Sequence, residues 1–215
     1  MFRIKKIIGR QIIDSRGNPT CEADIILDDG TLGRGAVPSG ASTGKLEAIE
    51  IRDNDPDLYL GKSVNKAVNN INHVISAEIN ASTAFDQESF DKFLIELDGT
   101  SNKERLGANT ILALSIAFAK AIANKNNIQL YQSLTDDSSY ILPIPMMNII
   151  NGGAHANNKL DFQEFMILPI GFDKITESIR AGAEIFHTLK DALNKLNMPT
   201  SVGDEGGFAP NLNSN

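Results

Sequence analysis

Residues 141–150 read ILPIPMMNII, and residues 151–156 continue as NGGAHA. The first part is apolar with little alternation, which is typical of a strand buried on both faces. The second part is polar and rich in glycine, as loops are. Because the preceding residues follow other patterns, this stretch marks the start of a second domain. We predict two domains, at residues 1–138 and 139–215.

The first domain begins with strand-like segments. Alternate positions of residues 20–28 are apolar, as in a half-buried strand; these positions are Cys21, Ala23, Ile25 and Leu27. Turn residues at 16–19 and 29–30 separate this segment from its neighbours. Residues 3–37 therefore predict a three-stranded antiparallel meander.

Helical periodicity follows the meander. One predicted helix face consists of Val64, Ala67, Val68, Ile71 and Ile75. A second helix is predicted from Asp86, as N-cap, to Asp98-Gly99. Its inward side chains are Phe90, Phe93, Leu94 and Leu97. A third helix covers residues 109–124, and strands followed by a run of helices predict an α+β domain.

In the second domain, residues 161–170 predict another apolar strand, which contains Gln163 and Glu164. In a regular strand these two side chains point to opposite faces, so we expect a bulge or a separate role for each. An amphipathic helix follows, with its apolar face at Ile175, Ile179, Ala183, Phe186, Leu193 and Leu196.

The composition restricts the classes of partner. The chain has 215 residues and a formal net charge of -7, which disfavours nucleic acid or an anionic membrane surface. An anionic substrate would need a local site, such as a metal ion or a few donors aimed at it, which points to a cation requirement. Cys21 is the only cysteine, and the sequence contains neither an apolar run of membrane-spanning length nor a signal core. We therefore expect a cytoplasmic protein without a membrane span.

Three polar, glycine-rich segments are candidates for chemistry. Residues 37–44, VPSGASTG, offer hydroxyl and backbone oxygens for a hard cation or a phosphate, although a plain surface loop has the same composition. His155 follows Gly152-Gly153, and a loop imidazole bonded to backbone is the alternative there. Residues 202–210, VGDEGGFAP, place Glu205 among glycines, as an acidic turn also would. Glu205 and Glu164 together would supply a carboxylate pair for acid catalysis.

In this order, the three segments resemble those of the enolase family. Other matching segments are residues 14–20, DSRGNPT; Glu47-Ala48 with Arg52-Asp53; residues 106–109, LGAN; and residues 145–153, PMMNIINGG. Any one of these motifs is weak, but the ordered set covers essentially the whole chain. The resemblance is to the N-terminal half of a bacterial-type member.

The resemblance implies an α+β capping domain followed by the start of a TIM-like α/β barrel of the enolase type. Enolases reversibly dehydrate 2-phosphoglycerate to phosphoenolpyruvate in glycolysis, and they use two Mg²⁺ ions and a lysine base. The implied class is a carbon–oxygen lyase, which in this family forms a homodimer or a larger oligomer.

The resemblance also implies a role for individual residues. Ser39 corresponds to the loop serine that reaches the second Mg²⁺, and Ala41 belongs to the same lid. Glu205 corresponds to the general acid, with Glu164 beside it sharing the proton. His155 and Gln163 correspond to substrate-binding positions, and Glu164 contacts the substrate as well. Arg10 and Glu22 correspond to positions that form salt bridges across the dimer.

A closed barrel needs about 250 residues, so residues 139–215 predict an incomplete one. In the family, the lysine base and the carboxylates of the first Mg²⁺ follow the region that corresponds to Asn215. We therefore expect a truncated chain without activity of its own. Two alternatives stay open: a non-catalytic fragment that docks on enolase subunits, and a cycloisomerase or racemase of the same superfamily.

Overall fold

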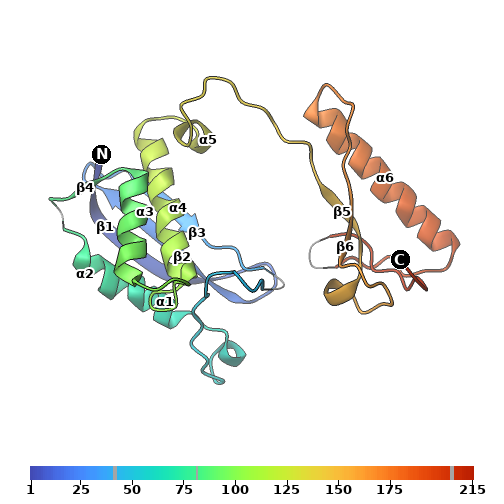
Figure 1. The fold of residues 1–215 in the computed structure, drawn as a ribbon, viewed down its shortest axis with the longest axis horizontal. Helices are drawn as coiled ribbons and strands as arrows, with labels where there is room; N and C mark the ends of the chain where they lie inside the picture. The colour runs from blue at the N-terminus through green and yellow to red at the C-terminus, as the bar shows by residue number, and fades with distance from the viewer. Residues whose placement is uncertain (41–42, 81, 204–205) are drawn as a thin grey trace. The chain divides into compact units, whose positions relative to one another are not determined.

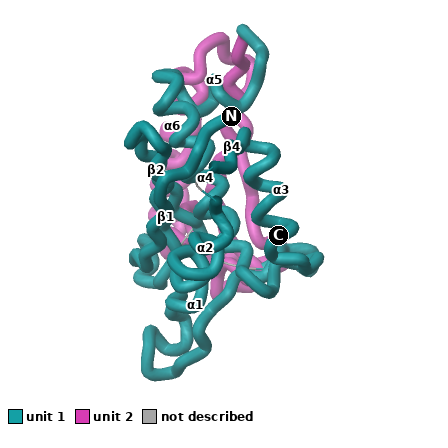
Figure 2. The backbone as a smooth tube through the Cα atoms, turned by 90° about the vertical axis from the view of Figure 1, so that its left-hand side faces the viewer, with its two compact units in different colours: residues 1–138 teal, residues 139–215 magenta. Residues whose placement is uncertain are grey.

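The computed structural model describes residues 1–40, 43–80, 82–203 and 206–215. Within them the chain forms two compact units, residues 1–138 and residues 139–215, which Figure 2 shows in different colours. Figure 1 labels most of the helices and strands. Unit 1 contains an antiparallel sheet and helices, so the predicted α+β class is confirmed. No helix in the described ranges has the length and apolar character needed to cross a bilayer.

The sheet of unit 1 has the strand order β3-β2-β1-β4. Its strands are β1 (Phe2–Ile13), β2 (Pro19–Leu27), β3 (Leu32–Ala36) and β4 (Ala84–Phe85). Neighbouring strands are antiparallel, and β1, β2 and β3 follow one another in the chain. The predicted meander is therefore confirmed.

One face of β2 forms the floor of the core. The four apolar positions predicted there are at most 1% exposed. Helix α4 (Ala108–Lys125) packs against β2 and β3 (Figure 1). Side chains at Gly33 or Gly35 would overlap the backbone of α4 at Ala117 and Ala113. These two glycines, facing small residues on the helix, therefore let α4 approach the sheet closely.

Residues 65–78 are helical, as predicted, but they do not form one regular helix. Helix α1 (Asn65–Asn69) continues as a π-helical turn, η2 (Asn70–Ile75), and ends in α2 (Ser76–Glu78). The side chain of Asn72 bonds to both the N–H and the carbonyl of Gly9, at 2.7 and 3.0 Å. This contact with β1 accompanies the widened turn, while the predicted inner positions Val64, Ala67, Ile71 and Ile75 are fully buried.

The predicted ends of the next helix are confirmed. Helix α3 (Gln87–Asp98) begins at the N-cap Asp86, which forms a capping box with Ser89, and ends at Gly99 in the left-handed conformation. Phe90 is fully buried and contacts the rings of Phe85, Phe93 and Phe118. The unit also contains the 3-10 turn η1 (Tyr59–Gly61) and the short helix α5 (Leu130–Ser133).

Unit 2 differs from the prediction in its strands. Strand β5 covers only Met147–Asn151, and β6 covers only Glu164–Ile167; the two pair antiparallel. Pro143 and Pro145 lack the N–H that a sheet ladder needs, which explains why residues 141–146 are not a strand. The prediction of burial on both faces was wrong, because residues 147–150 are only half-buried and Ile141 is 94% exposed.

Helix α6 (Ile175–Lys195) lies where it was predicted, but its buried positions are partly different. Ile179 and Leu196 are 50% and 64% exposed, whereas Ser178, Gly182 and Leu193 are buried. Gly182 lets the side chain of Met147 on β5 lie directly against α6, since a Cβ at this position would overlap the methionine sulfur. The ring of Phe186 stacks on Phe208 with 4.3 Å between centroids. These elements are the start of a barrel, not a closed one.

Candidate active site

The end of β5 leads into a tight turn that rests on the segment before β6. The 3-10 turn η3 (Gly153–His155) follows Gly152 directly. The N–H of Gly152 donates to the carbonyl of Gln163 at 2.9 Å, and the N–H of Gly153 donates to Leu160 at 2.7 Å. A Cβ at Gly153 would lie 2.9 Å from the carbonyl oxygen of Asp161. The glycines therefore allow this turn to lie directly against residues 160–163.

This packing brings His155 to Glu164. The Nδ1 atom of His155 lies 3.5 Å from Oε1 of Glu164, and the side chains are 13% and 24% exposed. An imidazole beside a half-buried carboxylate is an arrangement that can hold and move a proton. Gln163 is exposed and precedes β6 instead of lying inside it. The register shift is on β5, between Asn148 and Ile150, and not at Gln163-Glu164. Of the two alternatives expected there, the separate role for each side chain stays a prediction.

The glycine-rich segment of residues 202–210, called the acidic loop below, is attached to the end of β5. The N–H of Asn151 donates to the carbonyl of Phe208 at 2.8 Å, and the N–H of Phe208 donates to Ile149 at 2.8 Å. The side-chain amide of Asn151 donates to Gly206 and Gly207 at 2.6 and 3.0 Å. Glu205 lies outside the described residues, but both glycine-rich segments of unit 2 meet at the end of β5.

The Ser39 loop belongs to unit 1 and is anchored by charged side chains. The guanidinium of Arg16 donates to the carbonyls of Ser39 and Gly40 at 2.6 and 3.2 Å. The hydroxyl of Ser39 donates to Glu50 at 3.3 Å, and Glu50 is paired with Arg52 at 2.6 Å. The loop borders a hollow of about 890 Å³ that reaches Asp91 on α3 and Ser115 on α4. Ala41 lies outside the described residues.

Comparison with protein families gives two matches along the chain. Residues 4–134 match the model described as "Enolase, N-terminal domain". The chain belongs to the enolase family. Residues 139–215 match the model described as "Enolase, C-terminal TIM barrel domain". The family is one of lyases. The resemblance to enolases drawn from the ordered motifs is therefore confirmed, as is the fold of a capping domain followed by the start of a barrel, whereas the bacterial type stays a prediction.

The two residues expected at an enolase dimer contact bind each other within this chain. Arg10 Nη1 lies 2.6 Å from Glu22 Oε1, on neighbouring strands. Arg10 also pairs with Asp24, which Arg34 holds at 2.7 Å. The two arginines lower the pKa of Asp24 to about 2, and the carboxylates in turn raise the pKa of Arg10. Asp24 and Arg34 were missed because their alternation with apolar residues indicates only a solvated strand face.

Some oxygen atoms of this chain fit the Mg²⁺ that the enolase family uses. A serine hydroxyl near a carboxylate, as in Ser39 and Glu50, is the hard oxygen chemistry that Mg²⁺ prefers. Outside residues 41–42, 81 and 204–205, no three His, Cys, Asp or Glu side chains form a group that could hold a metal ion. The chemistry at Ser39 thus fits one contributing ligand, not a complete metal site.

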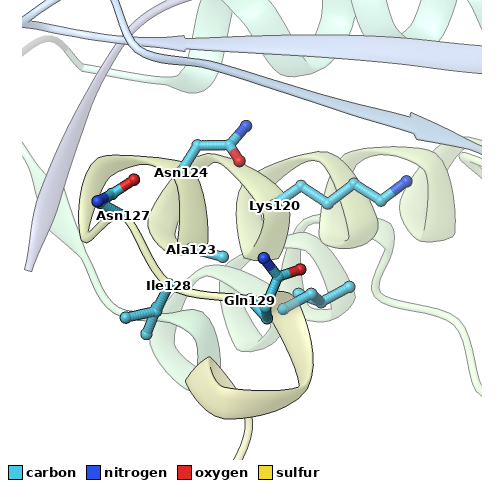
Figure 3. Close-up of a pocket in the computed structure, with 7 residues that line it drawn as sticks. Lys120, Ala123, Asn124, Asn127, Ile128 and Gln129 are labelled. Atoms are coloured by element: carbon cyan, nitrogen blue, oxygen red, sulfur yellow. The ribbon is translucent and has the colours of Figure 1, made fainter.

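A smaller hollow of about 340 Å³ lies at the end of α4 (Figure 3). It contains Lys120, Asn124, Asn127 and Gln129, together with the apolar Ala123, Ile128 and Leu130. The carbonyl end of a helix carries partial negative charge, which opposes binding of a phosphorylated acid there. None of the expected enolase site residues borders this hollow, so we do not assign the candidate site to it.

Proposed function

We propose that this protein takes part in the reversible dehydration of 2-phosphoglycerate to phosphoenolpyruvate. The observation that carries the proposal is the meeting of the acidic loop with the His155–Glu164 pair at the end of β5. In this elimination, the proton on the second carbon leaves to a base, and hydroxide leaves the third carbon as water after protonation. The residues on this chain belong to the side of the reaction that protonates the hydroxide.

Each candidate has a role in this proposal. Glu205 donates the proton to the departing hydroxide, and Glu164 shares and replaces that proton. His155, 3.5 Å from Glu164, holds the carboxylate and contacts the substrate, while Gln163 and Ala41 contribute further substrate contacts. Ser39 contributes oxygen atoms to the second Mg²⁺. When bound, the two Mg²⁺ ions neutralise the charge that develops on the substrate carboxylate.

Residues 1–215 by themselves are expected to give no turnover. In the family, the lysine that removes the proton and the carboxylates of the first Mg²⁺ follow the matched region. The acid side of a site cannot replace the base, because general acid and general base act on different atoms. The family resemblance also leads us to propose a cytoplasmic homodimer as the working form.

A chimaera tests the proposal directly. Residues 1–215 are joined to the remaining barrel of a characterised enolase, and phosphoenolpyruvate is followed by its absorbance with 2-phosphoglycerate and Mg²⁺. We expect activity in the chimaera and none in residues 1–215. Glu205→Gln and Glu164→Gln should each reduce kcat by about 10² to 10⁴-fold, the usual contribution of a positioned acid. A folded chimaera without activity would refute the proposed function.

A fragment that docks on enolase subunits is the second candidate. It is supported by the complete core of unit 1 and by the charged network of Arg10, Glu22, Asp24 and Arg34 on its sheet. Sedimentation of residues 1–215 mixed with an intact enolase tests docking separately from the activity of the chimaera. A mixed dimer would support docking, whereas separate species would oppose it.

A further inference from the structure

The side chain of Asn151 is a buried polar centre that joins three segments of unit 2. Asn151 is 1% exposed. Its Nδ2 donates to the carbonyls of Gly206 and Gly207, and its Oδ1 accepts from Nδ2 of Asn148 at 2.6 Å. Its own backbone carbonyl accepts from Asn158 at 2.9 Å, and Asn158 also donates to the carbonyl of Pro210 at 3.0 Å.

The partners fix which way the Asn151 amide is oriented. Two backbone carbonyls can only accept, so the atom that faces Gly206 and Gly207 must be the amide nitrogen. Asn148 supplies the donor that the Oδ1 atom requires. Every hydrogen-bonding atom of this side chain therefore has a partner, and both amide protons are used on the acidic loop.

The other end of the acidic loop is shaped around the same amide. The N–H of Gly203 donates to the carbonyl of Gly207 at 3.1 Å, and the N–H of Gly206 donates back to Gly203 at 3.1 Å. A Cβ at Gly203 would lie 2.8 Å from Nδ2 of Asn151 and 3.7 Å from the carbonyl oxygen of His155. Only glycine leaves room for the amide, and the loop end lies against the turn that carries His155.

We propose that Asn151 is the positioning residue of the acid side: its two donated hydrogen bonds hold the Gly206–Gly207 end of the acidic loop beside the His155–Glu164 pair. This inference rests on the proposed function, because it assigns Asn151 a purpose in placing the segment that contains Glu205. Asn151 acts through the loop backbone and does not itself exchange a proton with the substrate.

The decisive variant is Asn151→Asp, which keeps the size of the side chain and removes its donors. At pH 7.5 the introduced carboxylate faces two carbonyl oxygens, so the amide hydrogens of residues 203–209 should exchange at least about tenfold faster than in the unmodified chain. Burial among acceptors raises the pKa of the introduced carboxyl. At about pH 5 it regains one O–H donor, and the ratio to the unmodified chain should fall.

The matched control is Asn157→Asp, which makes the same charge change at an exposed position between η3 and β6. Among the described residues, the ionisable neighbours of Asn151 are Glu164, its register partner, and His155. These two residues, and Asp204 and Glu205 of the sequence, are the same in every variant, so their contribution cancels in the ratio. Exchange in Asn151→Asp that equals the control at both pH values would overturn the inference, because a space-filling side chain would not respond to protonation.

Gly203→Ala gives a second route if Asn151→Asp does not fold. The added Cβ displaces the Asn151 amide without a charge, so the loop should again exchange faster, now equally at both pH values. An unaffected loop in Gly203→Ala would overturn the inference. In the chimaera, Asn151→Asp should lower kcat with the same pH profile and leave KM nearly unchanged. Failure of the proposed function appears separately, as an inactive chimaera that retains Asn151.

Discussion

Unit 1 and unit 2 differ in how far they bury their apolar residues. In unit 1 the sheet and the helices enclose one continuous core, whose large members Phe90, Leu94, Leu114 and Phe118 are fully buried. In unit 2 the strands are short, and Ile170 and Phe162 are 68% and 62% exposed. The difference shows that a layered α+β domain can bury its apolar residues among its own elements, whereas the first elements of a barrel leave apolar side chains exposed.

The largest expected effect is a difference between the two units in their resistance to proteolysis. Thermolysin should cut first at the exposed apolar residues Ile141 and Leu142, which lie in a segment without helix or strand. We expect a resistant product that ends near residue 138, while residues 139–215 are degraded. Mass spectrometry of the products makes the measurement. Equal lifetimes of the two units would break the comparison, as would a product that retains residues 139–215.

The next effect is the loss of stability when a buried aromatic ring is removed from the core of each unit. Phe90→Ala removes a fully buried ring with three aromatic neighbours and should destabilise unit 1 by about 3 to 5 kcal/mol. Urea unfolding followed by circular dichroism measures this loss. The matched control is Phe208→Ala, which removes the buried ring of unit 2 that stacks on Phe186. If Phe208→Ala lowers the unfolding midpoint of unit 1 equally, the units are not independent.

Local signals explain most of what the sequence predicted. The alternation of β2 and the Asp86 cap depend on neighbours within a few residues, and both were predicted correctly. The π-helical turn was missed because it accompanies the contact of Asn72 with Gly9, 63 residues away. The strand predicted at residues 141–150 was too long. Its two prolines lack the N–H that a sheet requires, although the segment is apolar.

The candidate site was predictable only in part. The glycines near His155 and Glu205 in the sequence indicate backbone conformations that other residues rarely adopt. The family resemblance assigned both segments to one site. Their meeting at the end of β5 depends on hydrogen bonds between residues about 55 apart, which periodicity does not contain. Asn151 was missed as a positioning residue because an asparagine before two glycines is typical of an ordinary turn.

A smaller effect tests the charged network on the sheet of unit 1, where Asp24 is buried, whereas the ion pairs of Arg180 in unit 2 are exposed. The pKa of Asp24 is about 2 in the folded chain, below its ordinary value of 3.8. Its ion pairs therefore stabilise the fold above about pH 4, and this contribution disappears as the pH falls toward 2. Asp24→Asn should cost about 2 kcal/mol at pH 7 and much less near pH 2.

Urea unfolding at several pH values measures this dependence. The matched control, Asp57→Asn, changes an exposed carboxylate and should alter stability by under about 0.5 kcal/mol at each pH. A cost for Asp24→Asn that does not change with pH would show that packing, and not charge, is responsible.

The smallest effect concerns Asp86, the N-cap of helix α3 in unit 1. Asp86 accepts from the N–H of Ser89 at 2.9 Å, and the Asp86 N–H donates to the Ser89 hydroxyl at 3.0 Å. Asp86→Ala should cost about 1 kcal/mol, and Asp86→Asn, which keeps an accepting oxygen, only a fraction of that. Because α3 belongs to a closed core, the loss should appear in the whole transition of unit 1 and not as local fraying. Amide exchange that rises only in the first turn of α3, with an unchanged unfolding midpoint, would contradict this prediction. It would show that α3 can fray without unfolding the rest of unit 1.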